Sequence, residues 1–189
     1  MLGFRLSQGL FYLSAGVWLG ALVMLVVTAS ATFATVRAYQ PALPIELELA
    51  GEADAILAGA IVGRSLDRLM VVQLVCAAGA CLALTLEHTR YAGRLARRGR
   101  SAAARVRSLA LLVAVVMVAA NLAWIGPGVW QSRAVMYDAS ASGPERAAAR
   151  AVFDRYHRLS ERTHGLAALA LAGAILAGPF VPARVMIHE

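Results

Sequence analysis

The feature that most constrains the fold is a run of 31 residues without a charged side chain, from Leu6 to Val36. As a helix this run would extend about 46 Å, whereas about 20 apolar residues are enough to cross the hydrocarbon core of a bilayer. Three further uncharged stretches follow, at 69–86, 108–132 and 165–182. We therefore predict an all-α integral membrane four-helix bundle with spans at about 10–34, 69–87, 108–131 and 164–182.

Composition supports this class and argues against two others. Apolar residues make up 60% of the chain and the mean hydropathy is +0.66, more than a soluble domain can bury. The net charge of +7 raises the question of nucleic acid, but the arginines lie beside apolar spans and lack aromatic platforms on which bases stack. We expect the lipid bilayer as the partner and no nucleic acid.

The segment 88–107 carries seven arginines and no acid, and two apolar stretches lie on either side of it. Arginines overall divide equally, nine on each side of the predicted membrane, so their density in this segment decides the orientation. Basic segments stay preferentially on the cytoplasmic side, where anionic lipid attracts them. We predict a cytoplasmic basic loop at 88–107 that contacts anionic lipid, with both termini cytoplasmic, in the inner membrane of a bacterium.

Two predicted helices are longer than the bilayer requires, which indicates a small extracytoplasmic helical cap. Extensions at 55–68 and 144–163 precede the second and fourth spans. Ser142 or Gly143 can cap the latter, with Pro144 in its first turn. The third span should end at an aromatic belt with helix-breaking residues, 124–130. We expect 55–63 to pack against the stripe that contains Val152 and Tyr156.

Two GxxxG pairs, Gly16 with Gly20 and Gly59 with Gly63, indicate faces where another helix can approach closely. Their partner could be a helix of the same chain, a second copy in a homo-oligomer, or a larger membrane complex. The sequence alone leaves these alternatives open.

The chain contains no recognisable catalytic motif. It has no phosphate loop, dinucleotide fingerprint or CxxCH, and Asp154, His157, Ser160 and Glu161 fall on one helix with nothing to complete an oxyanion site. His157 and His164 are two turns apart, about 10.5 Å, too far to share a metal ion. We therefore expect a protein that is not an enzyme and holds no cofactor, with haem as the alternative.

Polar side chains near the predicted junction of bundle and cap are the candidates for a functional site, because polarity at membrane depth is costly. The alternative is hydrogen bonding that joins helices, which is also the expected role of Gln73, and Trp18 can instead be an interfacial anchor. The candidate cluster is His157, Arg158, Ser160, Asn121, Trp18 and Arg64.

The pattern FxxxHxxS at 153–160 enters the last span, and other short motifs accompany it: Trp18-Leu19-Gly20, the small-residue stretch 58–63, and Gln73 with Cys76. In this combination the chain resembles a bacterial four-span membrane family of unknown function related to the transmembrane protein 205 group. It departs from that pattern at 165–167, where an asparagine often stands. The resemblance implies a multi-pass membrane protein whose animal relatives are associated with drug resistance.

Together these patterns predict a multi-pass membrane protein with a structural, accessory or small transport-related role. The alternative is a haem- or copper-linked membrane redox protein, which needs two metal-directed side chains to converge.

Overall fold

A computed structural model describes residues 2–39, 53–96, 102–138 and 140–180 of the chain. Almost all of these residues are helical, and the described part contains no strand. The elements are α1 (Leu2–Tyr39), α2 (Ala53–Ala96), α3 (Ala102–Ala120), the π-helical turn η2 (Asn121–Ile125), α4 (Gly126–Met136), α5 (Gly143–Ala177) and the short 3-10 turn η3 (Gly178–Phe180).

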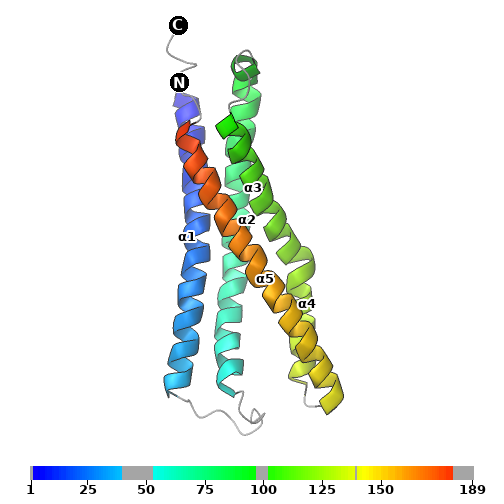
Figure 1. Cartoon of the computed structure of the whole chain (residues 1–189). Coiled ribbons are helices and arrows are strands. Elements are labelled where there is room, and N and C mark those ends of the chain that lie inside the picture. Colours follow the sequence, from blue (N-terminus) through cyan, green and yellow to red (C-terminus); the bar gives the residue numbers. More distant parts are fainter. Residues whose placement is uncertain (1, 40–52, 97–101, 139, 181–189) are drawn as a thin grey trace.

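Four helices of the described part are long and apolar enough to cross a membrane, because α3, η2 and α4 follow one another without interruption. The prediction of an all-α four-helix membrane bundle is therefore confirmed. α1 lies beside α2, and α5 crosses from α1 to α3 and α4 (Figure 1). One end of the bundle, which we call the basic end, contains the start of α1, the end of α5, the end of α2 and the start of α3. The opposite end, where α4 connects to α5, is called the α4–α5 end.

Small residues and glycines bring the helices together. The buried core is rich in alanine, including Ala15, Ala80 and Ala114, which are fully buried. A Cβ added to Gly79 of α2 would lie 2.5 Å from Ser14 Oγ of α1, so even an alanine there would force the Ser14 hydroxyl to move. Close backbone approach of this kind drives helix association in lipid, where apolar burial itself gives no advantage.

The sequence predicted that the third membrane helix ends at its glycine and proline residues. In the structure it does not end there. It continues through Gly126, Pro127 and Gly128 to Met136. Proline in a helix lacks a donor and its ring collides with the carbonyl four residues earlier, but the preceding π turn widens the helix and relieves that collision. The backbone N–H of Gly126 bonds to Asn121 O across this turn.

The basic segment also differs from the expected loop. α2 continues to Ala96 and α3 begins at Ala102, so most of 88–107 is helical. The span limits and the sidedness of this segment remain predictions.

The start of α5 confirms Ser142 as the residue that caps the helix N-terminus. Ser142 accepts a hydrogen bond from the Glu145 backbone N–H, the Glu145 side chain bonds back to Ser142, and Pro144 lies in the first turn. This reciprocal arrangement satisfies backbone donors that a helix start otherwise leaves unpaired.

The predicted contact between 55–63 and the stripe of Val152 and Tyr156 is wrong, because α2 and α5 have almost no close approach to each other. Gly59 and Gly63 instead lie against side chains of α4, and the Tyr156 ring lies over Gly128, also in α4. α4 occupies the place between the two extensions because the third membrane helix continues beyond Trp124.

Candidate functional site

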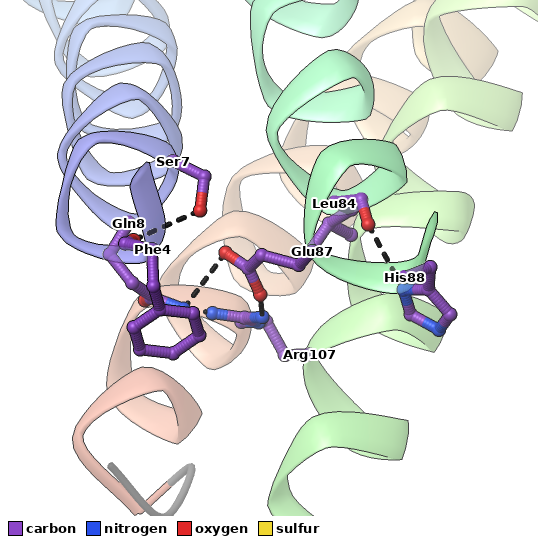
Figure 2. A network of polar contacts seen from close by, with 7 residues as sticks. All are labelled: Phe4, Ser7, Gln8, Leu84, Glu87, His88 and Arg107. Carbon is purple, nitrogen blue, oxygen red and sulfur yellow. Dashed lines mark hydrogen bonds and ion pairs between the residues drawn. The ribbon is translucent and has the colours of Figure 1, made fainter. Parts of the chain in front are cut away.

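Buried polar side chains gather at three levels along the bundle, and the first lies at the basic end. Arg107 of α3 donates from Nη1 to Gln8 Oε1 at 3.0 Å and from Nη2 to Glu87 Oε2. Gln8 of α1 donates from Nε2 to Glu87 Oε1 at 2.8 Å. Figure 2 shows these side chains converging between the helices. The three hydrogen bonds form a closed ring that joins α1, α2 and α3.

The charges in this ring are almost completely withdrawn from solvent. The side chains of Arg107 and Glu87 are 3% and 5% exposed. Either charge alone would be costly there, so each requires the other. The Arg107 guanidinium also lies 4.8 Å from the centroid of the Phe11 ring, a distance at which the aromatic face attracts a cation.

The second level is a single hydrogen bond in the middle of the core. Trp18 Nε1 of α1 donates to Gln73 Oε1 of α2 at 3.2 Å, and both side chains are essentially inaccessible. This contact confirms that Gln73 marks a helix contact. It also shows that Trp18 is a core residue and not an interfacial anchor.

The third level lies at the π turn, where Asn121 faces α5. Ser160 Oγ donates to Asn121 Oδ1 at 2.9 Å, and Asn121 Nδ2 donates to Thr163 Oγ1. Thr163 Oγ1 is also within hydrogen-bonding distance of the backbone oxygens of Leu159 and Ser160. Asn121 is therefore an interhelical hydrogen-bonding residue.

Of the six candidate residues, the structure brings together Asn121 and Ser160. Trp18 lies at a different level, on α1. The remaining three have exposed side chains: His157, Arg158 and Arg64. His157 stacks on Phe153 with a ring centroid distance of 5.5 Å and pairs with Glu161 at 3.3 Å, both on the same helix.

Serine and histidine do meet at the third level, but not in a geometry suited to nucleophilic catalysis. Ser160 Oγ lies 3.3 Å from His164 Nδ1, while the same nitrogen lies 2.8 Å from the Ser160 backbone oxygen. An N–H directed at that carbonyl is not an acceptor for the serine proton, so His164 is not positioned as the base for Ser160.

Among the described residues, no three His, Cys, Asp or Glu side chains are grouped so that they could hold a metal ion. His88 Nδ1 lies 3.0 Å from Leu84 O within α2, and His188 lies outside the described residues.

Sequence reasoning missed the ring of Gln8, Glu87 and Arg107. The sequence assigned no role to Glu87, and it placed Arg107 among the seven arginines of the predicted basic loop. One signal was available: an acid directly after the second apolar stretch and an arginine directly before the third are placed to meet when the two helices pack side by side.

Comparison of the chain with protein-family models, with curated proteins and with solved structures found no match.

Proposed function

We propose that this chain is a structural or accessory component of a bacterial inner membrane, with both termini in the cytoplasm and the arginines of 88–107 beside anionic lipid. A small transport-related role belongs to the same proposal. The resemblance to the four-span family related to the transmembrane protein 205 group is part of it, because that family shares the span number and the motif at 153–160.

One observation carries this proposal: at each of the three levels, buried polar side chains form hydrogen bonds with side chains of a neighbouring helix. Gln8, Glu87 and Arg107 close a ring, and Trp18 pairs with Gln73. At the third level Asn121 holds two hydroxyl groups of α5. Side chains used in this way orient and fasten helices, which is what a membrane scaffold needs.

A haem- or copper-linked redox protein is the rival. It requires side chains that leave their present partners to bind the metal, as His164 would have to leave the Ser160 carbonyl. An accessory role requires only that the outward faces of the helices meet another membrane protein.

The test is purification of the full chain from its native membrane in a mild detergent, followed by an absorbance spectrum, metal analysis and identification of bound proteins. An accessory role predicts a colourless sample with a membrane partner in fixed ratio, whose abundance falls in cells that lack this chain. A sample with haem or copper in stoichiometric amount would overturn the proposal in favour of the redox alternative.

A further inference from the structure

The third membrane helix has its π turn at the level where Asn121 faces Ser160 and Thr163 of α5, which is itself a continuous α-helix. On the side of this level away from the basic end, α4 and the start of α5 diverge from α1 (Figure 1). We propose that α4 and residues 143–160 of α5 form one arm that swings at this level, and that Arg133 latches the arm to α2.

The hinge in the third helix is the π turn. Gly126 donates its backbone N–H to Asn121 O, five residues earlier, and not to Leu122 O as an α-helix would require. Pro127, the next residue, has no N–H to donate. Two successive α-helical hydrogen bonds are therefore replaced or missing, and the resistance of the helix to bending falls at this point.

α5 has its own weakened stretch opposite the π turn. The Thr163 hydroxyl bonds to backbone oxygens of Leu159 and Ser160, and the His164 ring also bonds to Ser160 O. Side chains that bond to carbonyls of the preceding turn loosen and bend a helix. Gly165 follows and contributes a residue with low helix propensity. Asn121 bonds to Ser160 and Thr163, so it keeps the two weakened stretches at one level.

The two parts of the arm pack closely enough to move together. The Tyr156 ring lies directly over Gly128, where an added Cβ would come within 2.6 Å of the ring. The Trp124 ring meets the same tyrosine edge to face, with centroids 6.2 Å apart. The Tyr156–Gly128 contact and the extensive packing of α4 on α5 make α4 and residues 143–160 one body, whereas Trp124 belongs to the π turn.

The arm contacts α2 through the side chains of Arg133 and Trp130. Arg133 Nη1 donates to Gly59 O at 3.1 Å, and a Cβ added to Gly63 would lie 3.3 Å from Nη1 and 3.6 Å from the Trp130 ring. The rings of Trp130 and Tyr137 lie 5.9 and 5.5 Å from the guanidinium and hold it in place. Gly59 and Gly63, the second GxxxG pair, thus form the surface of α2 to which Arg133 binds. Movement of the arm away from α2 would expose this surface.

The test is pulsed electron spin resonance on the full chain in lipid nanodiscs, with Cys76 and Cys81 replaced by alanine. Spin labels at Ala60 of α2 and Ala134 of α4, both exposed, report the latch distance. A second pair at Ala134 and Ala151 of α5 reports whether the arm stays rigid.

Three variants separate the latch from the hinge. Arg133→Met should raise the population with the longer Ala60–Ala134 distance roughly tenfold, because one charged hydrogen bond to α2 is lost. Pro127→Ala in the same background should reduce that population, since it restores a donor at the hinge. Arg155→Met, at an exposed arginine on the arm, is the matched control and should leave both distances as in the parent chain.

The Ala134–Ala151 distance should stay constant throughout, which also shows that the variants remain folded. The proposal is overturned if Arg133→Met leaves the Ala60–Ala134 distribution unchanged, or if the Ala134–Ala151 distance broadens to the same extent. An unchanged long-distance population after Pro127→Ala would likewise overturn the location of the hinge.

Discussion

Removing one charge from the ring at the basic end should be among the most damaging single substitutions in the chain. Arg107→Met leaves the Glu87 carboxylate buried without its cation, with the acid side chain only 5% exposed. Breaking a buried pair in this way costs about 3–5 kcal/mol of unfolding free energy. The folding equilibrium constant should therefore fall between about a hundredfold and a few thousandfold.

Replacing both charges should be far milder, because no uncompensated ion remains. Arg107→Met combined with Glu87→Met should retain a loss of about 1–2 kcal/mol, from the Gln8 amide that loses both partners. The assay is unfolding by dodecyl sulfate in mixed micelles at neutral pH, followed by far-ultraviolet circular dichroism. Arg105→Met, at an exposed arginine of the same helix, is the control and should change stability by less than about 0.5 kcal/mol.

The reasoning would be refuted if the single and double variants lost the same stability, or if Arg107→Met behaved like the Arg105 control. Either result would mean that the pair is solvated and does not join the helices.

Three further predictions use the same unfolding assay. Gly79→Val should lower the unfolding free energy by about 1–3 kcal/mol, because the valine side chain collides with α1. Gly16→Ala should be neutral or slightly stabilising, because no atom lies within 4 Å of the added Cβ. Equal effects of the two substitutions would contradict the packing of α1 on α2. Trp18→Phe should cost about 1–3 kcal/mol because Gln73 is left without its donor, and adding Gln73→Leu should recover part of the loss. Ser142→Ala should cost about 1 kcal/mol and speed hydrogen exchange in the first turn of α5; unchanged exchange there would argue against the capping box.

Local signals predicted the parts of the fold that depend on neighbouring residues in sequence. Uncharged length predicted four spanning helices, and Ser142 followed by Pro144 predicted the start of α5. Gln73 was correctly expected at a helix contact, because a polar side chain within an apolar span needs a partner.

The parts that failed depend on residues far apart in sequence. Gln8 and Arg107 are separated by 99 positions, and only helix packing shows that they meet. Trp18 was misplaced for the same reason, since its burial depends on Gln73 of another helix. Pro127 was read as a helix end because a π turn, which lets a helix continue past proline, has no recognisable sequence signature.

The central claim of a four-span membrane protein is tested most directly at the third membrane helix, by labelling its two ends from the two sides of the membrane. In the background without native cysteines, Ala102→Cys lies at the start of α3 and Ser140→Cys between α4 and α5, both exposed. A membrane-impermeant maleimide applied to intact cells should label the cysteine at 140, and the one at 102 only after the membrane is permeabilised. Labelling of both cysteines from the same side would contradict the account.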